Sequence, residues 1–158
     1  MIRLESLTKE NIASVINSLS ELSQIEAHVF RVTEKEMQTK FENLVDMPFT
    51  ATLCDEHAPI ALWCLEAIGD KKWKCSFIFT KHVRQEAWKE ITRFSRAFSS
   101  EIVKDGGVIE FDTAFAHGTG KIHRWYEAMG FHYEKTSDDI STYIKGGKPC
   151  ALAAAAQQ

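Results

Sequence analysis

Two carboxylates and a group of positive charges are the side chains whose spacing in this sequence favours chemistry. Glu110 and Asp112 alternate with apolar residues in a strand-like run, which places both on one face of the expected strand. Carboxylates can accept protons, and the structural alternative is that they face solvent or pair with cations. Lys81, Arg84 and Lys89 surround the start of an expected helix. Their side chains can hold a phosphate, and a solvated cationic strand end is the alternative.

The histidines and cysteines predict no metal site. No pair of histidines has HExxH or C2H2 spacing, and no two cysteines form a CxxC pair. Cys54, Cys64 and Cys75 lie in apolar strand-like runs, which predicts three small buried side chains and a reducing compartment. His117 and His123 flank one loop and are candidates for a proton shuttle, because imidazole titrates near neutrality. A Ser-His-Asp triad is not expected, since the sequence has no GxSxG elbow.

Length, composition and charge indicate a globular protein with one domain. The 158 residues are 44% hydrophobic and 26% charged, and the net charge of -3 is too small to suggest nucleic acid as a partner. No apolar run reaches about 18 residues, so we expect no membrane span. The charged start of the chain lacks a signal-peptide core, so we expect a cytoplasmic location. Residues 1–148 are expected to form the domain, and the Ala-rich residues 149–158 to be flexible or docked on a partner.

Hydrophobic periodicity predicts an α+β fold that positions these side chains. Thr8 is expected to cap a helix that continues to Leu22, and Thr33-Glu34-Lys35-Glu36 has the capping-box pattern of a second helix. Further helices are expected over 85–104 and 122–129, and strands over 2–6, 49–54, 60–68, 72–80, 108–115, 131–135 and 140–144. The order β-α-α-β-β-β-α-β-α-β-β implies a central mixed, mostly antiparallel sheet covered by helices.

One short motif links this element order to a known family. The segment Trp125-Tyr126-Glu127-Ala128-Met129-Gly130-Phe131 is similar to the Tyr-x-x-x-Gly-Phe signature of the Gcn5-related N-acetyltransferase (GNAT) superfamily. The glycine of this signature ends a helix in a left-handed conformation, and the phenylalanine starts a core-facing strand. The resemblance implies an N-acetyltransferase that uses acetyl-CoA to acetylate an amine, which the sequence does not identify, and that needs no metal. It also implies that Tyr126 is the general acid, whereas its helical spacing with Ile122 and Met129 fits a core residue.

The same resemblance assigns cofactor and base roles. The family binds the coenzyme A pyrophosphate on a glycine-rich turn at a helix start, which corresponds here to residues 84–89. Arg84 matches the family pattern, whereas Ala87 replaces its first glycine and Lys89 its last small residue. The residues expected to contact the cofactor are Arg84, Gln85, Ala87, Lys89 and Thr119. Glu110 and Asp112 are the expected general bases, with Glu66 as a further candidate.

A second resemblance supplies an alternative function. The runs 75–80 and 142–147 are similar to GNAT-like internal virion or morphogenesis proteins of T7-like bacteriophages, which also lack the glycine-rich loop. This resemblance implies a non-catalytic, structural protein whose partners are other proteins of a virion or an assembly. Its location would then be the host cytoplasm or the virion.

Overall fold

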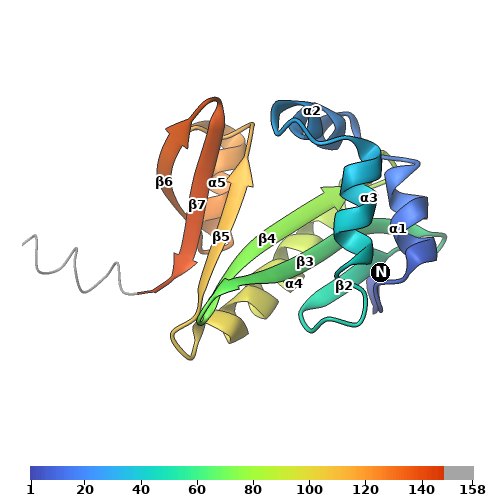
Figure 1. The fold of residues 1–158 in the computed structure, drawn as a ribbon, viewed down its shortest axis with the longest axis horizontal. Coiled ribbons are helices and arrows are strands. Elements are labelled where there is room, and N and C mark those ends of the chain that lie inside the picture. Colours follow the sequence, from blue (N-terminus) through green and yellow to red (C-terminus); the bar gives the residue numbers. More distant parts are fainter. Residues whose placement is uncertain (148–158) are drawn as a thin grey trace, which may run out of the picture.

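Seven strands form one sheet in residues 1–147, the part of the chain that this computed structural model describes (Figure 1). The strands are β1 (Arg3–Glu5), β2 (Thr50–Cys54), β3 (Pro59–Gly69), β4 (Lys72–Phe79), β5 (Val108–Thr113), β6 (His132–Ser137) and β7 (Ile140–Gly146). They lie in the order β1-β2-β3-β4-β5-β7-β6, and every neighbouring pair is antiparallel except β4 and β5. The predicted α+β class and mixed, mostly antiparallel sheet are therefore confirmed. The predicted tail over 149–158 lies outside the described residues.

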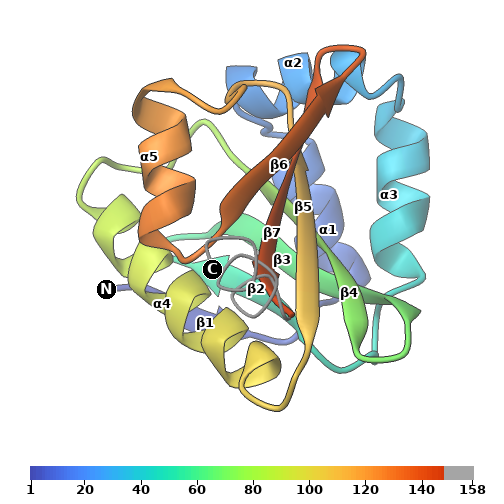
Figure 2. The same ribbon diagram turned by 90° about the vertical axis from the view of Figure 1, so that its left-hand side faces the viewer.

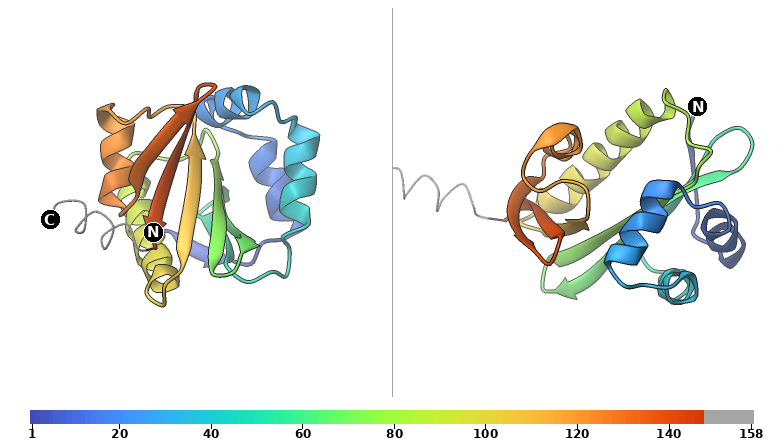
Figure 3. Two further views of the ribbon diagram at one scale, coloured as in Figure 1. Left: turned by 60° about the vertical axis from the view of Figure 1, so that its left-hand side comes forward. Right: turned by 90° about the horizontal axis from the view of Figure 1, so that it is seen from above.

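Helices cover both faces of the sheet (Figures 2 and 3). α1 (Lys9–Ile16) and α3 (Glu34–Glu42) lie on one face, α4 (Ala87–Val103) and α5 (Gly120–Ala128) lie on the other, and α2 (Glu21–Val29) lies across one end. Because strand side chains alternate between faces, β3 contributes Trp63 to the core under α4 and Leu62 to the core under α1 and α3. No helix within the described residues is long and apolar enough to cross a bilayer.

The first predicted helix is in fact two helices, so three helices precede β2 where the sequence predicted two. α1 ends at Ile16, and Leu19 then forms an isolated antiparallel bridge with Thr80. Ser20 caps a new helix, α2, by accepting a hydrogen bond from the Ser23 amide over 3.0 Å. The helical spacing of apolar residues continues across the break, but backbone bonding to the end of β4 interrupts the helix there.

The cysteines of the sheet are buried, as predicted. Cys54, Cys64 and Cys75 are all free thiols in the sheet core. Burial raises the pKa of Cys54 to about 11 and that of Cys64 to about 12. These thiols are therefore uncharged near neutral pH and serve as small apolar side chains.

The two central strands separate halfway along their length. β4 and β5 are paired in parallel only between residues 72–75 and residues 108–111. Beyond Cys75 and Phe111 the strands continue without pairing to each other, and Figure 1 shows them diverging in a V. This split leaves a gap in the middle of the sheet, between the two helical layers.

α2 spans the open end of the V and is bonded to both strand tips (Figure 1). At the β4 tip, the Ser20 amide donates to the Phe79 carbonyl over 2.9 Å, and the Phe79 amide donates to Ser23 Oγ over 3.3 Å. At the β5 tip, the Ala114 amide donates to Glu26 Oε2 over 3.1 Å. The helix missed by the sequence analysis therefore connects the two halves of the sheet.

The turn after α5 is held by a buried lysine. Gly130 has a φ of 95°, and the Phe131 amide donates to the Tyr126 carbonyl over 3.0 Å, as a left-handed helix end requires. The Lys145 ammonium, on β7, donates to the Met129 carbonyl over 2.7 Å and to the hydroxyls of Ser99 and Ser100 on α4, and the Arg96 carbonyl lies 3.3 Å away. Burial lowers the pKa of Lys145 to about 8. This lysine ties α4, α5 and β7 together.

Candidate active site

An aromatic cavity of about 590 Å³ lies on the α4–α5 side of the split. We call it the α4–α5 cavity. Its wall is largely aromatic, and Gln85, Lys89 and Lys121 supply polar and positive groups. The aromatic lining comes from both strand tips and both helices: Phe77, Phe79, Trp88, Phe111, Phe115, Trp125 and Tyr126. An aromatic cavity with positive groups suits a ligand that joins an apolar part to an anionic group.

A second cavity, of about 160 Å³, lies on the other side of the split, under α2 and α3. We call it the α2–α3 cavity. It shares four lining residues with the α4–α5 cavity: Ser23, Glu26, Phe77 and Phe111. The two cavities therefore meet at the gap between β4 and β5, where a ligand in one can approach a ligand in the other.

Glu26 is the carboxylate at this meeting point. Its Oε2 accepts hydrogen bonds from the Ala114 amide and, over 3.3 Å, from the Thr113 hydroxyl. Burial raises the pKa of Glu26 to about 7, and these two hydrogen bonds oppose only part of that rise. A carboxylate with a pKa near neutrality is well matched to accept a proton from an amine.

Tyr126 completes a chain of hydrogen bonds with Glu26. The phenol is buried and donates to Thr113 Oγ1 over 3.1 Å, and the Thr113 hydroxyl donates to Glu26. Burial, reinforced by the charge of Glu26, holds the pKa of Tyr126 well above its usual range. The predicted acid is therefore protonated at neutral pH and lines the α4–α5 cavity, and it is also part of the core, as the alternative prediction held.

The carboxylates predicted to be bases lie on the opposite face of β5 from Tyr126 and are paired with lysines. Glu110 Oε1 lies 2.9 Å from Lys72 Nζ, and Asp112 Oδ2 lies 2.5 Å from Lys74 Nζ. Asp112 also accepts from the Thr142 hydroxyl over 2.9 Å. Asp112 lines the α2–α3 cavity and Glu110 does not. Their ion pairs match the structural alternative, while the role of base stays a prediction for both.

The turn before α4 differs from an amide-lined anion site. The amides of Ala87 and Trp88 donate to the carbonyls of Arg84 and Gln85, over 3.0 and 3.3 Å, so both are already bonded. Glu86 occupies the N-cap position and makes no side-chain cap bond. Of the five residues predicted to contact the cofactor, Gln85 and Lys89 line the α4–α5 cavity. The other three, Arg84, Ala87 and Thr119, are not among its lining residues in the described chain.

The two histidines considered as proton shuttles are bonded elsewhere. His117 Nδ1 lies 2.8 Å from Ser141 Oγ. His123 Nδ1 lies 2.7 Å from the Tyr143 hydroxyl, and its Nε2 lies 3.0 Å from Glu127. Neither histidine bonds to Tyr126 in the described residues. Within residues 1–147 no group of three or more His, Cys, Asp or Glu side chains is arranged to hold a metal ion.

Sequence reasoning missed Glu26 and Lys121, the two charged residues that complete this site. A signal for Glu26 existed: Ser20 followed by Glu21 is typical of a helix start, and a helix beginning there would contain Glu26. For Lys121 the sequence holds no comparable signal, because a lysine in the first turn of a short helix is unremarkable on its own.

Comparison with known proteins identifies this fold. No family model and no curated protein matches the sequence. Among solved structures, the paia N-acetyltransferase of Thermoplasma acidophilum in complex with coenzyme A is similar at a TM-score of 0.65 and 12% identity, covering 92% of this chain and 99% of that chain. An aminoglycoside acetyltransferase in complex with coenzyme A gives 0.61 and 15%, covering 98% of both chains. A GNAT acetyltransferase of Bacillus anthracis gives 0.63 and 10%, covering 90% of this chain and 92% of that chain. The chain therefore has the fold of the GNAT acetyltransferases, as the sequence predicted.

Proposed function

We propose that this protein is an N-acyltransferase that transfers an acyl group from coenzyme A to an amine through the split in its sheet. The observation that carries this proposal is the meeting of two cavities at Glu26, one larger and aromatic and the other smaller. A two-substrate reaction needs two adjoining sites with a proton acceptor between them. Two of the structures similar in fold are complexes with coenzyme A, which supports the choice of donor.

The α4–α5 cavity fits the arm of coenzyme A better than its phosphates. Its aromatic wall suits an apolar chain, and about 590 Å³ falls within the size range of ligand pockets. The amides of Ala87 and Trp88 are already bonded and are not available to the phosphates. Lys89 and Lys121 are the cations of this cavity, and Gln85 adds an amide donor. We assign the phosphates to these three side chains.

Acyl-CoA supplies an activated thioester carbonyl. The amine nitrogen forms a bond with the acyl carbon, the C–S bond breaks, and the coenzyme leaves as a thiol. Glu26 accepts the proton of the amine, since its pKa lies close to neutrality. Tyr126 holds the proton that the departing sulfur requires, and Thr113 connects its hydroxyl to Glu26. The predicted bases Glu110 and Asp112 remain alternatives to Glu26.

Binding of coenzyme A tests this proposal. A ligand that binds only the folded chain raises the Tm with its concentration, and we expect such a rise in a thermal-shift titration. The double variant Lys89→Glu, Lys121→Glu should weaken binding by about tenfold or more and reduce its salt dependence. Lys104→Glu, at the far end of α4, is the matched control and should bind as the parent does. Absence of any Tm shift at millimolar coenzyme A would refute the proposal.

The alternative of a structural protein of a phage virion gains no support from the comparisons. It stays a prediction from the sequence, as does the cytoplasmic location. Co-purification with a larger assembly is the observation that would favour it.

A further inference from the structure

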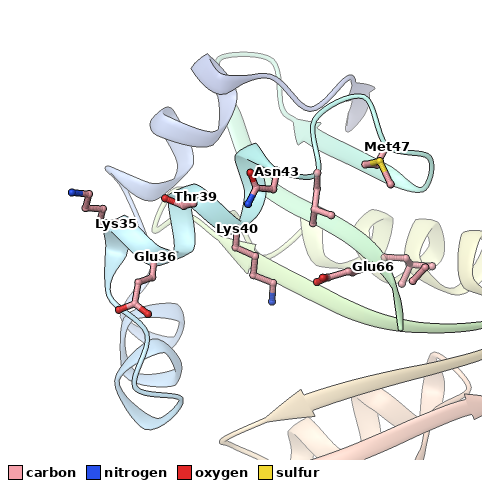
Figure 4. A pocket seen from close by; sticks show the side chains of 10 residues that line it. Lys35, Glu36, Thr39, Lys40, Asn43, Met47 and Glu66 are labelled. Carbon is pink, nitrogen blue, oxygen red and sulfur yellow. The ribbon is translucent and has the colours of Figure 1, made fainter. Parts of the chain in front are cut away.

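The α2–α3 cavity has an unpaired cation at its rim. Lys40, on α3, lines this cavity and also a wider groove of about 730 Å³ between α3 and the end of β3 (Figure 4). It makes no ion pair with any residue of 1–147. Lys40 is exposed, and Figure 4 shows its side chain extending from α3 over the strands.

The other two charged residues that line the cavity, Lys74 and Asp112, form an ion pair. Lys74 also lies 3.8 Å from Glu110. Glu66 lines the groove, and Figure 4 shows its carboxylate turned toward Lys40 without an ion pair. Two charges of the cavity are therefore left for a ligand: the Lys40 cation and the Glu26 carboxyl. A ligand with one positive and one negative group would complement them.

Apart from Ser23 and Ser76, the remaining wall of the cavity is apolar. Phe30, Met37, Phe41 and Ile78 line it, together with Val32 and the two phenylalanines at the split. Its volume of about 160 Å³ is close to that of the apolar cavity of about 150 Å³ that holds a benzene molecule in a well-studied lysozyme variant. The space is too small for a long polyamine and large enough for a single ring or a branched alkyl group.

We propose that the acceptor is a small amine that carries both an anionic group and an apolar group of about benzene's size, the chemistry of a hydrophobic α-amino acid. This inference rests on the proposed function and names the substrate of the same site. The anionic group lies against Lys40, the apolar group fills the α2–α3 cavity, and the amine points to the split. There the amine nitrogen forms the amide bond, the thioester C–S bond breaks, and the amine proton passes to Glu26.

Binding of L-phenylalanine to the full chain, measured by calorimetry without any donor, tests this inference. We expect phenylalanine to bind about tenfold or more tightly than phenethylamine, which lacks the carboxylate, and than phenylalaninamide, in which it is neutral. Lys40→Met should remove this preference and leave phenethylamine binding unchanged. Lys35→Met is the matched control, because Lys35 lines the groove but not the cavity. Glu66→Gln should tighten phenylalanine binding, since it removes the carboxylate that faces Lys40.

Three results would overturn the inference: no binding of phenylalanine at millimolar concentration, equal binding of the amide, or an unchanged preference in Lys40→Met. Equal binding of phenylalaninamide would indicate that the acceptor is a peptide N-terminus. Tighter binding of spermidine than of phenylalanine would indicate that the acceptor is a polyamine. A transfer assay with acetyl-CoA separates this inference from the proposed function. Acetylation of phenethylamine but not of phenylalanine keeps the function and removes the inference. Selective binding of phenylalanine without transfer keeps the binding site and removes the function.

Discussion

Glu26 owes its properties to its place at the β5 tip. The carboxyl is partly buried between two cavities, and this desolvation raises its pKa to about 7 although two donors bond to it. A carboxylate that is fully solvated ionises about three pH units lower and is a weaker base for an amine. The same burial gives this residue a consequence for catalysis and another for stability.

Glu26→Gln should lower acyl transfer by about 100- to 1,000-fold, because glutamine keeps an oxygen for the Ala114 amide but cannot accept a proton. In the parent protein, kcat/KM should rise with pH through a limb near pH 7, set by the pKa of Glu26. The variant should lack that limb.

The measurement is a pH profile of kcat/KM from about pH 5 to about pH 9. Glu21→Gln, on the same helix and exposed, is the control. A retained limb in Glu26→Gln would assign the base elsewhere, with Asp112 the next candidate.

The stability of the protein should depend on the same carboxyl. The folded-state pKa of Glu26 is about 7 and the unfolded value about 4.3. Between these values the folded state binds more protons, so the free energy of unfolding falls as the pH rises from about 4 to about 8. Glu26→Gln should lack this fall and so gain about 2 kcal/mol relative to the parent between about pH 5 and about pH 8. Urea denaturation of the parent and the variant at about pH 5 and about pH 8 measures this gain. If the difference in free energy of unfolding between the two proteins were the same at both pH values, the pKa of Glu26 would not be raised by folding.

Among the elements, α5 and the strand after it were predictable because their signals are local. Gly130 has the left-handed φ expected from the motif, and Phe131 is buried as predicted. Lys145, in contrast, was not recognised, since nothing near it in sequence indicates a buried lysine. The four oxygens around its ammonium belong to residues 16 to 49 positions away.

Gly106 and Gly130 have similar positive φ angles, but only Gly130 lies against Lys145. Alanine substitutions at both positions therefore separate the free-energy cost of a left-handed alanine from the cost of displacing Lys145. Gly106 has a φ of 88° with no atom within 4 Å of an added Cβ, whereas a Cβ at Gly130 would lie 2.9 Å from Lys145 Cε. Gly106→Ala should therefore cost about 1 kcal/mol, the price of the left-handed conformation alone. Gly130→Ala should cost about 2–3 kcal/mol, because it also displaces the Lys145 side chain from the oxygens to which its ammonium donates. Urea denaturation of both variants measures the loss in the free energy of unfolding. Equal losses would mean that the Lys145 side chain moves away from the added methyl group without a free-energy cost.

The first half of the chain shows what sequence patterns could not reveal. Apolar spacing favoured one helix from Thr8 to Leu22. The break in that helix depends on the pairing of Leu19 with Thr80, a residue far away in the sequence, which local patterns cannot reveal. The position of Glu26 follows from that break. The turn before α4 was predictable only in part: Ala87 and Lys89 signalled a departure from the family, but the bonding of the Ala87 and Trp88 amides follows from backbone geometry.

For the molecule as a whole, the split predicts where a donor changes hydrogen exchange. The edges of β4 and β5 that face each other beyond Cys75 and Phe111 are not paired to one another. Coenzyme A in the α4–α5 cavity should slow amide hydrogen exchange in residues 76–79 and 112–115. Residues of both strand tips line that cavity, so binding raises the free energy needed to open the tips locally. Exchange in β1 and β2 should stay unchanged. Mass spectrometry with and without coenzyme A measures this, and protection confined to other segments would place the donor elsewhere.

The bonding of α2 to both strand tips has a consequence for acyl-group selectivity. The antiparallel part β1–β4 and the part β5–β7 are joined within the sheet by only four residue pairs, all at the end of the split away from α2. α2 connects the two strand tips across the open end: Ser20 and Ser23 are hydrogen-bonded to the β4 tip, and Glu26 is hydrogen-bonded to the β5 tip. In the proposed enzyme, an acyl group wide enough to force the tips apart would break the Ala114–Glu26 bond and move the proposed base away from the amine. We therefore expect bulky acyl groups to be rejected in the chemical step rather than at binding, because the width of the gap and the position of the Glu26 carboxyl change together.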